Sequence, residues 1–338
     1  MWFETLMGFR EETPEQVRSN LSINNGVLRS KVNGKEYTHG FLETPSLGEL
    51  RERVHSLSLP QNKLTVREVI GDVQKLHADT ENTNALFQVA SQFNLLEMVS
   101  PENTPEQGVT RYEYDHTQGP ACAIAAGAGT IYRNYCVELD GQMGQTEHRQ
   151  LDCLSDLGAA LGNTGQYWKM VNGYVLATEQ GLHAINTQLS GLSETDRDTL
   201  RQRLRIGIQW NTEVTISDDK PLVTQVYCSA LPVAYSEHSS ELWRDFAQLV
   251  LEAAYEATLC AGILNSHKNG NNTVYLTLLG GGAFGNENDW IFRAIRRALD
   301  RYQQADLDVA IVSYARSNSA VQKLVTDWSE YSKNGNIS

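Results

Sequence analysis

The stretch that decides the fold is VYLTLLGGGAFGNENDWI, residues Val274–Ile291. A largely apolar run, typical of a buried strand, leads directly into a glycine-rich turn, and a helical pattern begins at Asp289. Glycines permit backbone conformations and close approaches that other residues resist, so successive N–H groups can converge on one point. A turn of this kind that opens a helix is a candidate anion site. It lacks the lysine of a triphosphate-binding loop and the spacing of a dinucleotide fingerprint.

The sequence around this stretch alternates between helix and strand patterns. Leu242–Ile263 has apolar residues at helical spacing, and Asp289–Tyr302 is a second expected helix. Thr273–Leu279 and Val309–Tyr314 have the composition of strands. Such alternation predicts an α/β layered sheet with parallel neighbours and helices on both faces. Ligands of such sheets bind in the crevice beyond the carboxyl ends of the strands.

Composition narrows the class of protein. The 338 residues include 28 Lys+Arg and 41 Asp+Glu, a formal net charge of −13. This balance argues against partners that are nucleic acids or anionic membrane surfaces. The five cysteines lie far apart with no metal-ligand or disulfide spacing, and the acidic start lacks the features of a secretory signal. We therefore expect a cytoplasmic protein, without a membrane span, a metal or a cofactor.

The first 80 residues differ from the rest in pattern. Leu21–Thr38 alternates around Asn33-Gly34, which suits a hairpin turn, and Leu47–Leu57 and Val66–His77 have helical spacing. No long Pro/Gly/Ser linker follows. We expect residues 1–80 to be an N-terminal α+β extension packed on a main domain of residues 81–330.

A second unusual stretch follows the predicted strand Leu86–Val89. It passes through the polar turn Ser91-Gln92-Phe93-Asn94 and a loop containing Asp115, His116 and Gln118. The small-residue run Ala121–Gly129 then permits close backbone approach, and Thr130–Val137 is rich in β-branched and aromatic residues, which predicts a strand. Polar residues that gather on a loop after a buried strand are typical of binding groups.

In these segments the chain resembles a divergent macrodomain. More narrowly, it is similar to the MavL-like, arginine-specific macrodomain ADP-ribosylhydrolases. The resemblance rests on residues 87–97, 108–113, 117–123 and 127–135, and on the glycine-rich stretch 280–291. It implies a three-layer α/β/α macrodomain-like mixed sheet and hydrolysis of the N-glycosidic bond between ADP-ribose and a protein arginine.

The resemblance also implies a set of site residues. Asn94 matches a ribose-holding residue, residues 125–129 match the small-residue loop that follows it, and residues 280–286 match the loop that wraps the diphosphate. Hydrolysis passes through an oxocarbenium-like transition state, which requires carboxylates near the anomeric carbon. The expected catalytic residues are Asp289, Glu287, Asp115 and Asn286. The expected ligand-binding residues are Phe87, Gln92, Phe93, Asn94, Gln118, Ala126, Gly127, Ala128, Gly129, Gly280, Gly281, Gly282, Ala283, Phe284 and Gly285.

Several alternatives stay open at this stage. The glycine-rich turn could be an ordinary strand–helix connection with Asn288 as N-cap. The same crevice would also suit a non-catalytic reader of ADP-ribose or a hydrolase of another derivative, such as O-acetyl-ADP-ribose. The expected partners are ADP-ribose and an ADP-ribosylated protein, and the expected state is a monomer.

Overall fold

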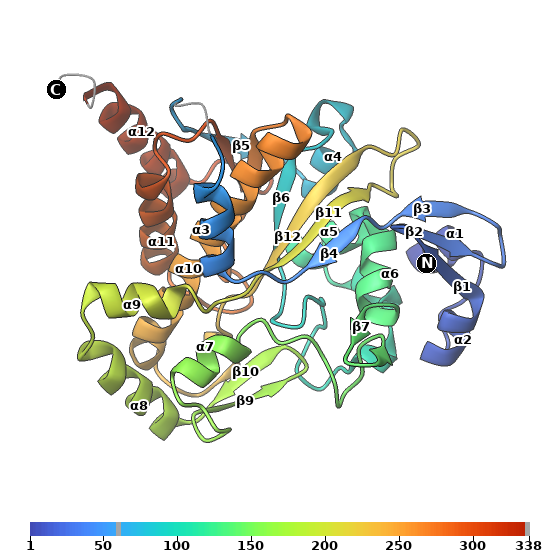
Figure 1. Ribbon diagram of the computed structural model, residues 1–338, viewed down its shortest axis with the longest axis horizontal. Helices are drawn as coiled ribbons and strands as arrows, with labels where there is room; N and C mark the ends of the chain where they lie inside the picture. The colour runs from blue at the N-terminus through green and yellow to red at the C-terminus, as the bar shows by residue number, and fades with distance from the viewer. Residues whose placement is uncertain (59–61, 335–338) are drawn as a thin grey trace.

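A seven-stranded mixed sheet forms the centre of the protein (Figure 1). The computed structural model describes residues 1–58 and 62–334. The sheet runs parallel from β12 to β5, whereas β11 is antiparallel to both of its neighbours. In spatial order the strands are β4 (Phe41–Glu43), β11 (Gly207–Glu213), β12 (Leu222–Cys228), β6 (Leu86–Ala90), β13 (Thr273–Leu276), β14 (Asp308–Ser313) and β5 (Thr65–Ile70).

The two faces of this sheet are covered by different helices, as the side chains of β6 demonstrate. Consecutive residues of a strand point to opposite faces. The Gln88 amide donates to Thr258 Oγ1 on α10 (Ser240–Asn269) at 2.9 Å. The neighbouring Phe87 ring instead stacks on His77 of α4 (Val73–Ala78), with ring centroids 3.8 Å apart. Helices α10 and α4 therefore lie on opposite faces.

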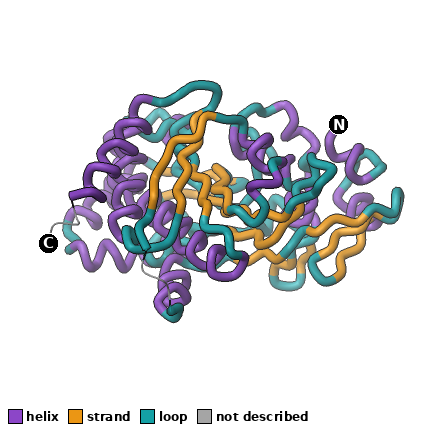
Figure 2. Tube along the Cα trace, turned by 90° about the horizontal axis from the view of Figure 1, so that it is seen from above, coloured by secondary structure: helices purple, strands orange, loops and turns teal. Residues whose placement is uncertain are grey.

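The remaining helices complete the two layers, and Figure 2 shows the strands running between helices. This three-layer arrangement around a mixed sheet confirms the predicted fold class. Packed with α10 are α3 (Leu47–His55), α8 (Glu179–Ser190), α9 (Glu194–Arg201) and α11 (Asn288–Arg301). With α4 lie α5 (Gln118–Ala125) and α6 (Gly127–Tyr135), and α12 (Ser319–Asn334) packs on the edge strand β5.

Helix α10 is the central element of the core. By length and composition it could cross a membrane, but 83% of its most apolar window is buried inside the protein. Trp243, Phe246 and Tyr255 on this helix are fully buried. A helix that is apolar on most sides and surrounded by a sheet and other helices is a core helix of a globular fold.

The N-terminal region contributes to the main sheet as well as forming a unit of its own. Strands β4 and β5 belong to residues 1–80, yet they are the two edge strands of the central sheet. The predicted division at residue 80 therefore does not coincide with a structural division. A smaller sheet and a second apolar cluster lie beside α6. Its elements are α1 (Trp2–Met7), α2 (Pro14–Asn20), β1 (Leu21–Asn24), β2 (Val27–Ser30) and β3 (Glu36–Thr38).

Two predicted elements have the wrong secondary structure. Val66–His77, expected as one helix, is strand β5 followed by the short helix α4, with Asp72 as its N-cap. Thr130–Val137, expected as a strand, lies largely in helix α6, where the Thr130 hydroxyl donates to the Ala123 carbonyl oxygen. In β5 the β-branched residues favour the strand that pairs along its length with β14, although the apolar spacing suggested a helix. In α6 the packing on β11 overrides the local propensity for a strand.

Short elements connect the larger ones. They are β7 (Glu138–Leu139), β8 (Gln142–Met143), α7 (Ser155–Ala160), β9 (Trp168–Val171) and β10 (Tyr174–Ala177), together with 3₁₀ turns at Thr80–Asn82, Pro105–Gln107, Thr110–Tyr114 and Val233–Tyr235. The turn Thr80–Asn82 leads into the start of β6, whereas Val233–Tyr235 follows the end of β12.

Candidate functional site

A cavity of about 220 Å³ lies at the carboxyl ends of the parallel strands. We call it the central cavity. The segments that follow β6, β12 and β13 line it, together with the N-terminus of α5 and the glycine-rich turn. This is the position at which an open α/β sheet binds its ligands.

Glu97 is the most unusual residue of the central cavity. Its side chain is only 4% exposed, and its Oε1 atom has no hydrogen-bond partner within the described chain. Burial raises the pKa of Glu97 well above its ordinary value, although the Arg133 guanidinium acts in the opposite direction. The nearby Asp115 carboxylate raises the pKa further. A buried carboxyl with a raised pKa in a cleft is a candidate general acid.

The turn that carries Glu97 is held by buried polar groups. The Gln92 amide accepts the Met98 N–H at 2.9 Å and donates to the Met98 carbonyl oxygen at 2.7 Å, which closes the turn. Leu95 has φ of +64°, a conformation that is strained for leucine. Arg133, fully buried on α6, donates from Nε to the Leu95 carbonyl oxygen at 3.0 Å. Strain that is fixed by a buried cation is typical of a pre-organised site.

Asp115 lines the same cavity immediately before α5. Its Oδ1 accepts the Thr117 N–H at 2.9 Å. Helix α5 then begins against the end of β6, and this contact requires Gly119. A Cβ at position 119 would lie 2.1 Å from the Ala90 carbonyl oxygen and 2.2 Å from Glu97 Oε2. The glycine thus lets the positive end of the helix dipole and its free N–H groups approach the cavity and Glu97.

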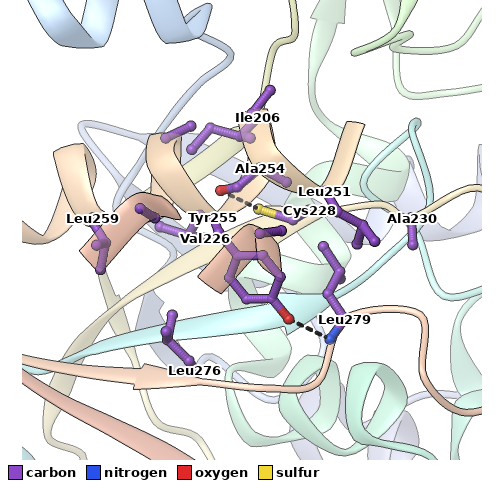
Figure 3. Packing of buried hydrophobic residues seen from close by; sticks show 14 of the residues in the cluster. Ile206, Val226, Cys228, Ala230, Leu251, Ala254, Tyr255, Leu259, Leu276 and Leu279 are labelled. Carbon is purple, nitrogen blue, oxygen red and sulfur yellow. Dashed lines mark hydrogen bonds between the residues drawn. The ribbon is translucent and has the colours of Figure 1, made fainter. Parts of the chain in front are cut away.

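The glycine-rich turn forms the opposite wall. Tyr255 on α10 fixes the start of the turn, because its hydroxyl donates to the Thr277 carbonyl oxygen and accepts the Leu279 N–H at 2.8 Å (Figure 3). Gly280 adopts φ of +75°, which favours glycine. Within the described chain, the N–H groups of residues 282–284 have no hydrogen-bond partner. Free N–H groups at a turn suit an anionic group such as a diphosphate.

Three aromatic rings close one side of the cavity. Tyr174, Tyr235 and Phe284 lie with ring centroids 5.2–5.5 Å apart. The Tyr174 hydroxyl donates to the Met98 carbonyl oxygen at 2.6 Å, which ties the ring to the turn that carries Glu97. The ring faces offer a surface on which a ribose or a base can pack.

Two further hollows open from the central cavity on different sides. One, about 560 Å³, shares Thr277 and Leu278 with the cavity and continues past the end of β14 to Tyr314 and Arg316. We call it the β14 hollow. The other, about 510 Å³, shares Glu97 and Asp115 with the cavity among other residues, and we call it the rim hollow. The central cavity alone is smaller than a typical ligand site of about 300–1,000 Å³, so a nucleotide-sized ligand must extend into a hollow.

The structure brings several of the predicted site residues together. Gln92 and Gln118 line the cavity, but their amides are occupied by the chain itself: Gln118 accepts the Ala90 N–H and donates to the Gln88 carbonyl oxygen. The predicted residues that line the central cavity are Gln92, Asp115, Gln118, Gly280, Gly282, Ala283 and Phe284.

Asn94, expected to hold the ribose, does not reach the cavity. Its side chain is fully buried, donates to Gln150 Oε1 at 2.8 Å and accepts the Leu96 N–H at 3.1 Å. Phe87 and Phe93 are also core residues: Phe87 is stacked between His77 and Tyr275, and Phe93 is 2% exposed. These three assignments are wrong, because the residues face the interior.

The predicted small-residue loop is also corrected. Ala126, Gly127, Ala128 and Gly129 lie at the junction of α5 and α6, fully or nearly buried and away from the cavity. A Cβ at Gly129 would lie 2.9 Å from Thr212 Oγ1 of β11. The small residues therefore serve the packing of a helix on the sheet.

The acids after the glycine-rich turn lie outside the cavity. Asp289 is 65% exposed and pairs with Arg293 at 3.0 Å, one turn further along α11. Glu287 accepts a hydrogen bond from the Ser240 hydroxyl at 2.6 Å. The Asn286 amide is buried and donates to the Leu231 carbonyl oxygen at 2.8 Å, so it supports the turn from behind. The structure therefore does not bring Asp289, Glu287 and Asn286 into the central cavity with Asp115, and Gly281 and Gly285 likewise do not line it.

Sequence reasoning missed Glu97, Gly119 and the two tyrosines. Glu97 lies within the block that carried the resemblance, but nothing in its neighbours indicates that its carboxyl is buried. Tyr235 lies in a 3₁₀ turn and Tyr174 in a short hairpin, and the sequence around neither residue indicates a binding site. The glycine at position 119, followed by Pro120, was the one sequence feature that indicated a close approach of the backbone of this segment to a neighbouring element.

Comparisons with known proteins complete the description. Among the described residues, no group of three or more His, Cys, Asp or Glu side chains is arranged to hold a metal ion. No protein-family model matches the chain, and no curated protein matches it.

Among solved structures, the chain is similar to poly(ADP-ribose) glycohydrolase from Deinococcus radiodurans in complex with ADP-ribose. The identity is 12%, the TM-score is 0.45, and the match covers 94% of this chain and 95% of the other. It is also similar to the Thermomonospora curvata poly(ADP-ribose) glycohydrolase bound to the inhibitor ADP-HPD, with 8% identity, a TM-score of 0.44 and coverage of 93% and 95%.

Proposed function

We propose that this protein is an ADP-ribosylhydrolase that cleaves the N-glycosidic bond between ADP-ribose and an arginine side chain. The observation that carries the proposal is the pair of carboxyls in the central cavity. Glu97 is buried and its Oε1 atom has no hydrogen-bond partner within the described chain, whereas Asp115 is half-buried and hydrogen-bonded to a backbone N–H. Two acids in contrasting environments are what hydrolysis of a glycosidic bond requires.

The ADP moiety fits between the glycine-rich turn, which lies opposite the acids, and the start of α5, which lies beside Glu97. Backbone N–H groups can bind a diphosphate without a lysine or arginine side chain. Such groups are available at residues 282–284 of the glycine-rich turn and at the start of α5. The reacting ribose then lies between Phe284 and the acids. The adenosine extends along the β14 hollow towards Tyr314, which is 78% exposed, and Arg316.

The chemistry divides between the two acids. As the bond from C1″ to the guanidinium nitrogen breaks, its electron pair leaves with the nitrogen, and positive charge develops on the ribose. The Asp115 carboxylate stabilises this charge and accepts a proton from the attacking water, whose oxygen bonds to C1″. The neutral carboxyl of Glu97 donates a proton to the departing guanidine, so protons balance over the reaction. Burial raises the pKa of Glu97 and so favours the protonated form that this step uses.

A substrate panel tests the proposal. ADP-ribose linked to arginine, serine or glutamate, and O-acetyl-ADP-ribose, are each incubated with the wild-type chain, Glu97→Gln and Asp115→Asn. We expect turnover of the arginine linkage, a loss of about 100-fold or more in kcat in each variant, and ADP-ribose affinity within about threefold of wild type by calorimetry.

Two results would overturn the proposal. Preferred turnover of another linkage would remove the arginine specificity. Tight ADP-ribose binding with no turnover of any substrate would identify a reader module instead.

A further inference from the structure

Residues 2–11, which we call the N-terminal segment, contact the part of the chain that leads into the central cavity. Helix α1 packs on the 3₁₀ turn Thr110–Tyr114, which lies directly before one of the two acids of the cavity. The Trp2 backbone N–H donates to Glu113 Oε2 at 3.1 Å. The Trp2 indole Nε1 donates to the Val109 carbonyl oxygen at 3.3 Å. The N-terminal segment therefore holds this turn from outside the cavity.

Glu11 makes the most specific of these contacts. Its Oε1 atom accepts the Val109 N–H at 2.9 Å, and its Oε2 atom accepts the Thr110 N–H at 2.7 Å. The Tyr135 hydroxyl of α6 also donates to Glu11 Oε1, at 2.7 Å. Gly108 permits the approach, because a Cβ at this position would lie 2.4 Å from Glu11 Oε2. Both oxygens of the carboxylate are thus used to fix the start of the turn to α6.

Tyr112, in the same turn, contacts both acids of the cavity. Its N–H donates to the Val109 carbonyl oxygen at 3.1 Å, next to the N–H groups that Glu11 holds. The Tyr112 hydroxyl accepts the Glu97 N–H at 3.0 Å, and the Tyr112 carbonyl oxygen accepts the Asp115 N–H at 3.2 Å. A displacement of this turn would therefore move the backbone of both acids.

Apolar packing connects the N-terminal segment to the other side of the Glu97 turn. Leu96 and Met98, the residues that flank Glu97, are buried in the same apolar cluster as Tyr112. Helix α1 contributes three fully or nearly buried side chains to this cluster: Phe3, Leu6 and Met7. The position of Glu97 thus depends on the N-terminal segment through packing as well as through hydrogen bonds.

We propose that Glu11 is a positioning residue of the active site, which sets the relative placement of Glu97 and Asp115 through Tyr112. The inference rests on the proposed function, because it takes the roles of the two acids from there. Glu11 does not line the central cavity and so does not touch the reacting atoms. A shift of about 1 Å in a catalytic group can cost about 100-fold in rate. Loss of the Glu11 carboxylate should therefore slow bond cleavage and leave the binding of the ADP moiety nearly unchanged.

The test uses four variants of the full chain, each assayed at a temperature at which it is folded. Glu11→Ala removes the carboxylate, whereas Glu11→Gln keeps one acceptor oxygen. Tyr135→Phe removes only the third donor to Glu11 and leaves the two backbone N–H groups paired. The matched control is Glu12→Ala, which removes the same charge from an exposed neighbouring residue.

We expect kcat on ADP-ribosyl-arginine to fall about 30–100-fold in Glu11→Ala, with the Kd of ADP-ribose by calorimetry within about threefold of wild type. Glu11→Gln should lose about three- to tenfold in kcat, and Tyr135→Phe less than about threefold. Glu12→Ala should match the wild type. Hydrogen exchange at the Val109, Thr110 and Glu97 N–H groups should be about tenfold faster in Glu11→Ala, with no change in α10.

Wild-type kcat in Glu11→Ala would overturn the inference. Faster exchange throughout the chain, including α10, would also overturn it, because it would show a general loss of stability. The same holds if Tyr135→Phe reproduces the full loss of kcat, since the carboxylate would then serve α6 and not the turn. If Glu11→Ala does not fold, wild-type kcat in Glu11→Gln has the same force.

The exchange measurement also separates this inference from the proposed function. If the wild-type chain does not hydrolyse ADP-ribosyl-arginine, the proposed function fails. The exchange rate of the Glu97 N–H in wild type and in Glu11→Ala then still decides whether Glu11 fixes the turn that carries Glu97.

Discussion

Replacement of Gly119 by alanine is the sharpest test of how the site is assembled. Gly119 is the second residue of α5, and in an ordinary helix a glycine-to-alanine change stabilises the protein by about 0.5–1 kcal/mol. Here the added Cβ would lie 2.1 Å from the backbone oxygen of Ala90 and 2.2 Å from Glu97 Oε2. Both distances are far below the 3.4 Å at which ordinary contact begins.

The clash fixes both the sign and the size of the effect. The Ala90 oxygen belongs to the backbone of β6 and cannot rotate away, so the start of α5 must retreat by about 1 Å, a displacement that can cost about 100-fold in rate. Overpacking of this kind costs about 1–3 kcal/mol, which exceeds the usual gain from alanine. We therefore expect Gly119→Ala to lower kcat/KM by about two orders of magnitude and to lower the Tm.

The assay is hydrolysis of ADP-ribosyl-arginine, with thermal unfolding followed by circular dichroism. The control is Gly191→Ala at the end of α8, where the nearest atom to the new Cβ is 3.6 Å away. It should keep full activity and an equal or slightly higher Tm. Wild-type activity together with an unchanged or raised Tm in Gly119→Ala would refute the close approach of α5 to Glu97.

Three further outcomes are expected. Because the pKa of Glu97 is raised in the folded state, its contribution to stability is present below the unfolded pKa of about 4.5 and is lost as the pH rises. The wild type should therefore lose stability relative to Glu97→Gln between pH 4.5 and 8, as measured by the unfolding free energy in denaturant titrations. Glu256 is fully buried, accepts hydrogen bonds from Arg51 and Arg297, and forms an ion pair with Arg301. Glu256→Gln should lower the free energy of unfolding in urea by about 3–5 kcal/mol. The control Glu330→Gln, at an exposed position, should lower it by less than about 0.5 kcal/mol. Asp289→Ala breaks an exposed ion pair with Arg293, so the free energy of unfolding should change by less than about 1 kcal/mol. We expect kcat to change by less than about twofold. A large loss of kcat would show that Asp289 is an active-site residue.

The sequence allowed the layered fold to be predicted because its later elements have strong periodic patterns. Leu242–Ile263 was expected as a helix and lies inside α10, and the strand–turn–helix at 274–291 is present as β13, the glycine-rich turn and α11. Such patterns record which face of an element is buried, and burial is what the sheet and its helices require.

The errors arose where local pattern and tertiary position disagree. Residues 121–135 are small, β-branched or aromatic, which suggested a loop and a strand, but they form two helices because small residues let α6 pack closely on β11. Asp289 follows a glycine-rich turn, a position that favours acid at any helix start, whether or not a ligand is near. Glu97 shows the reverse case, since only the fold reveals that its carboxyl is buried.

The edge strands of the central sheet have a consequence for the way the protein is made. Strand β5 ends at residue 70, yet its partner β14 begins at residue 308. Strand β4 ends at residue 43, and its partner β11 begins at residue 207. During synthesis β4 and β5 are the first strands of the central sheet to leave the ribosome, and β5 keeps an unpaired edge until β14 has emerged. Closure of the sheet is a late event that joins distant parts of the chain, so we expect slow folding and a requirement for protection of these edges in the cell.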